Sequence, residues 1–422
     1  MLNAADIPFT SKRGDEGGKF RHLGDQRYAF TLPGLSLELD RLRRSSHELW
    51  GELTVRVNGR FPNARTFDDG ILQVGDLNLS SVQARTTRGK LLAERAGEKD
   101  TDWAGLLEEF TTRVIAAERS GHPSIGLAEA PLEEESDPVQ YTVEGWPLLA
   151  DLPVILFGDP ASTKSQLAVW AAGTLALRGI PVLYLDWELS GSRHRKRVER
   201  LFQPPPNASQ FRYLRCENPL IRIIDGILAE IRRWKIRYVV CDSIGWGVEG
   251  SPMDPEAATR YFNAVRRFNC GSLHLAHIAK NQEEGKDPTI FGSNFFRAGA
   301  RSAWYVEKAT DNPDHEIRIG LFQRKNLDGP EQRTPLGYRL VFGHHRTQVL
   351  PVALESIDEL AVRLPMVDRI RAALASGPVS VKRLAEDLGS QPNIVRAVLA
   401  KHKSQFVRLG DKVNLKQPGM DF

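Results

Sequence analysis

One short stretch limits the fold of this chain more than any other: residues 158–165, which read GDPASTKS. The apolar run LPVILF precedes it, and KSQLAVWAAGTLALRG, which has helical character, follows it. A buried strand, a tight loop and a helix in this order match most of the pattern G-x-x-x-x-G-K-[ST], which binds phosphate through backbone N–H groups and the helix N-terminus. Gly158, Lys164 and Ser165 are in register with the pattern, but Thr163 replaces its second glycine.

The loop is therefore predicted to bind the phosphates of ATP, with Lys164 reaching the β- and γ-phosphates and Ser165 a ligand of Mg²⁺. Ala161 and Thr163 stand where glycine is common, because glycine tolerates positive φ and brings no Cβ near the phosphates. Taken alone, the segment is also compatible with a capped turn between a strand and a helix. The predicted cofactor contacts are Gly158, Asp159, Pro160, Ala161, Ser162, Thr163, Lys164, Ser165 and Gln166.

Two carboxylates follow other strand-like runs. RYVVCDS ends an apolar run in Asp242, and a carboxylate at such a strand end can hold Mg²⁺ through water. Earlier in the chain, VLYLDWELS carries Glu188 at the end of the second candidate strand, where a carboxylate can activate an attacking water. Asp242 could equally cap the end of a strand, and Glu188 could be a solvated residue at a helix start.

The order of these motifs resembles a known family. The phosphate-loop segment, LDWELS, VVCDS, LHLAHIAKN, FGSNFFRAGARSAWYVEK and LFQRKN follow one another over roughly residues 140–345. This order is similar to that of the RecA-fold ATPases, most of all the plasmid RepA-type hexameric helicases and more distantly the replicative helicases and the RadA and KaiC groups. Thr163 departs from the family pattern, which usually has a glycine before the lysine.

The resemblance implies roles for individual residues. Glu188 corresponds to the catalytic base, Asp242 to the Walker B acid and His277 to the residue that senses the γ-phosphate. Arg324 and Lys325 correspond to a basic pair that reaches the nucleotide of a neighbouring subunit, which implies a homo-oligomer, possibly a hexamer. The residues by themselves also allow a core histidine at 277 and plain surface charges at 324 and 325.

Composition shifts divide the chain into segments. Period-two alternation between residues 28 and 81 and an amphipathic pattern in TDWAGLLEEFTTRVIAAERSG indicate a small α+β unit. Strand-like runs alternating with helical segments indicate a mainly parallel sheet. We expect a mobile arm at 1–25, an α+β N-terminal domain at 26–128, an acidic linker at 129–139, a RecA-like α/β ATPase domain at 140–352 and a C-terminal winged helix-turn-helix at 365–418.

The C-terminal segment is the strongest candidate for DNA binding. Residues 366–416 hold ten Lys or Arg and four Asp or Glu, a larger positive excess than the whole chain's +4. Asn393, Arg396 and Lys403 lie on the predicted recognition helix, and Arg408 and Lys412 lie on the predicted wing. A protein-docking module is the alternative.

The resemblance also implies that two loops, residues 245–256 and 280–297, face single-stranded DNA. The first is acidic. The second carries Lys280, Lys286 and Arg297, with Phe291 available for stacking, but it also holds Glu283, Glu284 and Asp287. A third basic segment holds Arg85, Arg88, Lys90 and Arg95, and no role is assigned to it.

Composition excludes several other classes of protein. The three cysteines have no paired spacing, which argues against a disulfide framework or zinc site and favours the cytoplasm. No apolar run approaches 18 residues, so neither a membrane span nor a signal peptide is expected. The preferred interpretation is a Mg-ATP-dependent, DNA-associated motor, such as a ring-forming helicase or a related replication or mobile-element ATPase. The alternative is a DNA-binding regulator or adaptor that uses ATP as an assembly switch, with slow or absent hydrolysis.

Overall fold

The computed structural model describes residues 18–24, 26–98, 100–120, 126–129, 140–279, 288–327, 332 and 334–416. The chain divides into two compact units, Met1–Glu133 and Glu134–Phe422. Most of the predicted arm and of the predicted acidic linker falls outside the described residues. None of the helices in the described part is long and apolar enough to cross a membrane.

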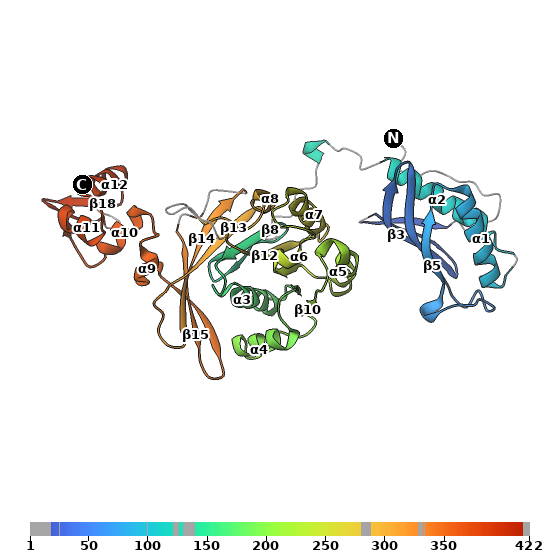
Figure 1. Ribbon diagram of the computed structural model, residues 1–422, viewed down its shortest axis with the longest axis horizontal. Helices are drawn as coiled ribbons and strands as arrows, with labels where there is room; N and C mark the ends of the chain where they lie inside the picture. The colour runs from blue at the N-terminus through green and yellow to red at the C-terminus, as the bar shows by residue number, and fades with distance from the viewer. Residues whose placement is uncertain are drawn as a thin grey trace. The chain divides into compact units, whose positions relative to one another are not determined.

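The first unit is a five-stranded antiparallel sheet with two helices packed on one face (Figure 1). Its strands, in chain order, are β1 (Lys19–Gly24), β2 (Arg27–Leu32), β3 (Leu35–Ser45), β4 (Glu48–Val57) and β5 (Ile71–Asn78). A short 3₁₀ turn, η2 (Asp68–Gly70), precedes β5, the helices are α1 (Val82–Ala96) and α2 (Trp103–Ser120), and η3 (Leu127–Glu129) follows them. Buried residues alternate along β4, so one face of the sheet joins the core with Phe30 and Trp103.

Two features of this unit differ from the sequence predictions. β1 lies inside the range predicted to be a mobile arm, because residues 19–24 pair with β2. The basic segment without an assigned role forms α1, in which Arg85 is buried and its Nε donates to Glu108 Oε2 at 2.6 Å. Arg85 therefore holds α1 against α2.

The second unit is built on a nine-stranded sheet of order β10-β9-β11-β12-β8-β13-β14-β15-β16. The parallel strands are β8 (Pro153–Gly158), β9 (Val182–Asp186), β10 (Phe211–Arg215), β11 (Tyr238–Asp242), β12 (Gly271–His277) and β13 (Ser302–Lys308). The strands β14 (Glu316–Asn326), β15 (Leu336–Phe342) and β16 (Thr347–Val352) extend it antiparallel. A hairpin of β6 (Gln140–Val143) and β7 (Trp146–Leu149) precedes it. The unit thus has the mainly parallel α/β fold predicted from its apolar runs.

Helices cover both faces of this sheet (Figure 1). One face packs against α3 (Lys164–Leu177) and α4 (Gly191–Leu201). The other packs against α5 (Leu220–Trp234), α6 (Ile244–Gly247), α7 (Pro255–Arg266) and α8 (Asn294–Gly299). Burial on both faces explains why the central strands are apolar throughout rather than alternating.

The last part of the chain is a small helical group. Its elements are η4 (Leu354–Ser356), α9 (Asp358–Ala361), α10 (Met366–Ala373), α11 (Val381–Asp387) and α12 (Pro392–Lys401), with a sheet of β17 (Val379–Ser380), β19 (Lys412–Leu415) and β18 (Phe406–Leu409). Ile370, Leu384 and Val395 form its centre. Arg396, Lys403, Arg408 and Lys412 are exposed. Its assignment to the winged-helix class and to DNA stays a prediction.

Candidate nucleotide site

A cavity of about 320 Å³ opens where the parallel strands β8, β9, β11 and β12 end. Ligands of open α/β sheets bind at this edge. Lys164, Ser165, Glu188, Asp242 and His277, which the sequence singled out, all line the cavity. Its lining is Ala161, Ser162, Thr163, Lys164, Ser165, Gln166, Glu188, Arg197, Asp242, Ser243, Leu275, His277 and Phe342.

The loop between β8 and α3 has the backbone shape of a glycine-rich loop without most of the glycines. At Gly158 a Cβ would lie 2.6 Å from the Val306 carbonyl oxygen, so only glycine fits. Ala161 and Thr163 have φ of 62° and 65°, in the left-handed region. A residue with a Cβ rarely adopts this region, and a β-branched residue such as Thr163 least of all, because the side chain crowds the backbone; each such residue costs on the order of 1–3 kcal/mol. The loop keeps its shape under strain.

Lys164 begins α3 and turns back over the loop. Its Nζ donates to the Gly158 carbonyl at 3.0 Å and to the Asp159 carbonyl at 2.7 Å. Burial lowers the pKa of Lys164 to about 8, although the charges of Asp242 and Glu188 act to raise it. The ammonium group therefore lies in a site that favours an added negative charge.

Asp242, at the end of β11, lies opposite Ser165. The Tyr184 hydroxyl donates to Asp242 Oδ2 at 2.8 Å, and the Ser165 side chain also hydrogen-bonds to this carboxylate. Burial raises the pKa of Asp242 from its ordinary value, and these two bonds oppose that rise. A hydroxyl and a carboxylate side by side are the oxygen donors that Mg²⁺ takes in phosphate-binding sites, so the pair fits the ion.

Glu188 follows β9 and faces the same space. The Ser243 hydroxyl donates to Glu188 Oε1 at 2.5 Å, and His277 Nε2 lies 3.9 Å from the same oxygen. The interaction with His277 lowers the pKa of Glu188, burial opposes this, and the bond from Ser243 lowers it further. Glu188 is thus ionised at neutral pH, as a base must be. Ser243 was not singled out in the sequence.

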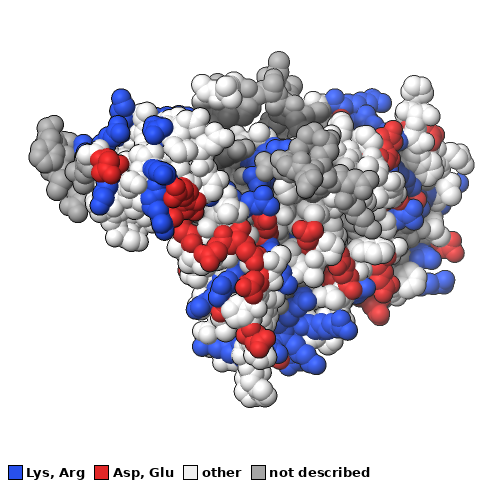
Figure 2. Space-filling view, turned by 60° about the vertical axis from the view of Figure 1, so that its left-hand side comes forward, with Lys and Arg blue, Asp and Glu red and all other residues white. Residues whose placement is uncertain are grey.

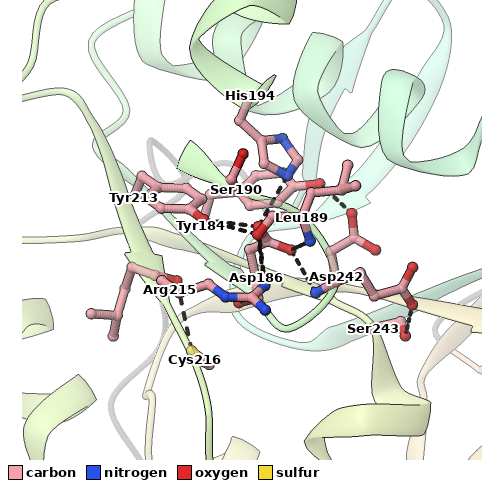
Figure 3. Close-up of polar contacts among 12 residues, drawn as sticks. Tyr184, Asp186, Leu189, Ser190, His194, Tyr213, Arg215, Cys216, Asp242 and Ser243 are labelled. Atoms are coloured by element: carbon pink, nitrogen blue, oxygen red, sulfur yellow. Dashed lines mark hydrogen bonds and ion pairs between the residues drawn. The ribbon is translucent and has the colours of Figure 1, made fainter. Parts of the chain in front are cut away.

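A buried carboxylate fixes the loop that carries Glu188 (Figure 3). Asp186 is fully buried, and its Oδ1 accepts from the backbone N–H groups of Glu188 and Leu189, both at 2.9 Å. Its Oδ2 accepts from the Tyr213 hydroxyl at 2.8 Å and lies 3.3 Å from His194 Nε2. Burial raises the pKa of Asp186, but these bonds outweigh it and leave the pKa lowered.

One oxygen or nitrogen from each of Asp186, His194 and Asp242 lies within 4.8 Å of the others, a spacing that a metal ion could use. However, both oxygens of Asp186 already accept hydrogen bonds from protein donors. Asp186 and His194, with Tyr213, are therefore better described as a scaffold that joins β9, α4 and β10 than as a metal centre.

Arg324 and Lys325, near the end of β14, do not line the cavity. Lys325 Nζ donates to the carbonyls of Arg297 and Ala300, both at 2.6 Å, at the C-terminal end of α8. The Arg324 guanidinium lies 5.5 Å from the centre of the Phe322 ring. Action on a neighbouring subunit stays a prediction for both residues.

The two loops predicted to face DNA are described in part. Residues 280–287 of the second loop, with Lys280 and Lys286, lie outside the described residues. Phe291 is 42% exposed, and Trp246 of the first loop is 68% exposed. The Ser293 N–H donates to the Pro252 carbonyl at 2.9 Å, so the two loops touch.

Comparisons with known proteins do not assign this chain to a family. No family model matches the sequence, and no curated protein matches it significantly. Among solved structures, a KaiC-like protein from the hyperthermophilic archaeon Pyrococcus horikoshii OT3 matches at 13% identity, over 48% of this chain and 91% of that chain, with a TM-score of 0.38. At this TM-score the match carries no argument, and the α/β assignment rests on the strand order and the β8–α3 loop.

Proposed function

We propose that this chain is a Mg-ATP-dependent ATPase. The observation that carries the proposal is the convergence of Lys164, Ser165, Glu188 and Asp242, from three separate strand ends, on one cavity. Lys164 neutralises phosphate charge, and Ser165 and Asp242 hold the metal ion. When bound, Mg²⁺ supplies charge stabilisation at the β- and γ-phosphates.

Glu188 is the base in this proposal. Its ionised state and its position beside His277 suit it to orient a water molecule and accept a proton from it. A backbone hydrogen bond joins His277 to the second loop: the His277 carbonyl accepts from the Phe291 N–H at 2.8 Å. A change in the contact between His277 and the phosphate would therefore act on this loop.

Two variants separate binding from chemistry. Lys164→Ala removes the phosphate-binding cation and should abolish binding of a fluorescent ATP analogue. Glu188→Gln keeps the shape and loses the charge, so it should bind the analogue normally and lose turnover by about 100-fold or more. Lys308→Ala, an exposed residue outside the cavity, is the control. Unchanged binding in Lys164→Ala would place the nucleotide elsewhere.

We also propose that DNA is the partner. Exposed Trp246, Phe291 and Phe295 on neighbouring segments suit stacking with single-stranded bases, and the basic C-terminal group suits duplex phosphates. Turnover should then rise with single-stranded DNA, and Trp246→Ala should remove much of this stimulation. If single-stranded DNA leaves the turnover of the folded protein unchanged, the protein is not a DNA-driven motor.

A second candidate is an ATP-dependent assembly switch that hydrolyses slowly. The left-handed backbone at Ala161 and Thr163 favours it, because a strained loop has less freedom to adjust during turnover. DNA-stimulated turnover distinguishes the two: a motor should hydrolyse ATP faster with single-stranded DNA, whereas an assembly switch should assemble on ATP and hydrolyse it slowly with or without DNA.

The proposed trans role of Arg324 and Lys325 has its own test. Inactive Lys164→Ala protein and inactive Arg324→Ala/Lys325→Ala protein are mixed, and ATPase activity is measured. Some activity should return, because one interface in a mixed oligomer holds both intact halves. No return of activity, although the variants co-assemble, would indicate a site complete within one subunit.

A further inference from the structure

Arg197 lines the nucleotide cavity, although no sequence motif pointed to it. It belongs to α4, whose sequence GSRHRKRVERL is strongly basic. Figure 2 shows Lys and Arg side chains gathered on the lower part of the visible face. A basic helix of this kind ordinarily indicates a solvated surface, so the position of Arg197 needs an explanation.

The donors of Arg197 are arranged differently from those of its neighbours on α4. Arg195 Nε donates to Glu199 at 2.7 Å, and Arg200 Nη2 donates to the Gly343 carbonyl at 2.6 Å. Arg197 Nη1 is buried and has no hydrogen-bond partner among the described residues. A buried guanidinium N–H without an acceptor is unfavourable, and such groups are uncommon in folded proteins. The cavity that Arg197 lines is where an acceptor would bind.

The scaffold around Asp186 anchors the helix that carries this arginine. His194, three residues earlier on α4 and therefore one helical turn away, is buried against Asp186. The positive charge of Arg197 also acts on Tyr184, whose hydroxyl donates to Asp242. The guanidinium therefore shares the cavity with Ser165 and Asp242, where phosphate and metal would bind.

We propose that Arg197 donates hydrogen bonds to phosphate oxygens of the nucleotide bound in its own subunit. The inference rests on the proposed ATP site and adds a second cation to it. A guanidinium suits this role because its planar donors match phosphate oxygens and its charge persists at any working pH. The site thus carries an arginine of its own, in addition to any group from a neighbouring subunit.

Binding of two probes to the full chain tests the proposal: a fluorescent Mg-ATP analogue and inorganic triphosphate with Mg²⁺, measured by competition. Arg197→Ala should weaken both by about tenfold or more, as expected for a lost charge-assisted hydrogen bond. Arg197→Lys should recover part of the affinity. Arg195→Ala, on the same helix with its side chain 81% exposed, is the matched control and should bind like wild type.

Each outcome separates this inference from the proposed function. If wild-type protein binds neither probe, the ATP site itself is wrong. If wild type binds both and Arg197→Ala matches Arg195→Ala, only the role of Arg197 is overturned. Weaker binding of the ATP analogue with unchanged binding of triphosphate would also overturn it, because the contact would then be to the nucleoside. Equal thermal unfolding midpoints of the two variants show that a loss of affinity is not a loss of fold.

Discussion

The loops after β8 and β9 both present functional groups to one cavity, but different forces hold them. In the β8–α3 loop the constraint is in the backbone, with Ala161 and Thr163 at positive φ. In the β9–α4 loop the constraint is a buried carboxylate, Asp186, which binds two backbone N–H groups. The first loop is strained and the second is fixed by side chains. Changes to the two loops should therefore have opposite effects on function. Removing the carboxylate from the β9–α4 loop should lower turnover, whereas removing the backbone strain from the β8–α3 loop should raise the affinity for ATP.

The largest effect is expected at Asp186. Asp186→Ala leaves the N–H groups of Glu188 and Leu189 without their acceptor, and leaves the Tyr213 hydroxyl only the Leu189 carbonyl, at 3.5 Å. Glu188 then loses its fixed position, and a displacement of about 1 Å can cost on the order of 100-fold in turnover. Binding of the ATP analogue should change little, because Lys164 and Ser165 lie on the other loop. Turnover and affinity, measured together, check this.

Two milder variants show whether Asp186→Ala loses turnover because Glu188 is misplaced or because the protein unfolds. Asp186→Asn keeps an acceptor for the two N–H groups and should recover part of the turnover. Tyr213→Phe removes the bond of 2.8 Å to Asp186 without an added cavity in the loop, and should lower turnover less than Asp186→Ala. Wild-type turnover in folded Asp186→Ala would show that Glu188 is positioned by other contacts or is not the base.

An effect of intermediate size is expected from pH, which changes the charge of Lys164 beside the strained loop and so the affinity for ATP. The pKa of Lys164 is lowered to about 8 from 10.5 by burial, so the empty site loses its proton above that pH. ATP binds the protonated form, and affinity should fall by up to about tenfold per pH unit above pH 8. Calorimetry in two buffers of different ionisation enthalpy should detect proton uptake on binding near pH 9. No uptake there would mean that Lys164 stays charged in the empty site.

The same shift affects stability in the opposite direction. Between about pH 8 and 10.5 the unfolded chain binds more protons at this lysine than the folded chain does. The contribution of Lys164 to the free energy of unfolding therefore rises with pH across that window. Unfolding of wild type and Lys164→Met at pH 7 and pH 9.5 isolates this contribution.

The sequence predicted one of the two loops better than the other. Register with a phosphate-binding pattern identified Lys164, Ser165 and the two positions that take positive φ, because that pattern is local. The role of Asp186 was not predicted, because in the sequence it is simply the last residue of a strand and its partner Tyr213 comes from β10, 27 residues away. Arg197 escaped notice because its burial depends on how α4 packs.

Strand direction was a second feature that the sequence did not predict. Apolar runs predicted β8, β9 and the strands from β11 to β15, but the runs do not encode direction, so the antiparallel arrangement of β14 and β15 was not foreseen. β10 was missed because all of its residues are only partly buried or exposed, and its sequence FRYLR has two arginines. Sequence thus located the strand ends that form the site, while the contacts that position their side chains needed the tertiary structure.

The smallest effect is expected from relief of the strain itself. Glycine adopts positive φ without the penalty of a side chain, so Thr163→Gly should remove part of a cost of roughly 1 kcal/mol. The Thr163 hydroxyl bond to the Ser162 carbonyl, at 2.6 Å, would also be lost, and the unfolded chain would gain entropy. Affinity for the ATP analogue should rise by a few-fold, with a small change in unfolding free energy. Arg178→Gly, after α3, controls for the added glycine. If Thr163→Gly binds more weakly than wild type, the threonine side chain is itself part of the phosphate site, and both loops would be held by side chains.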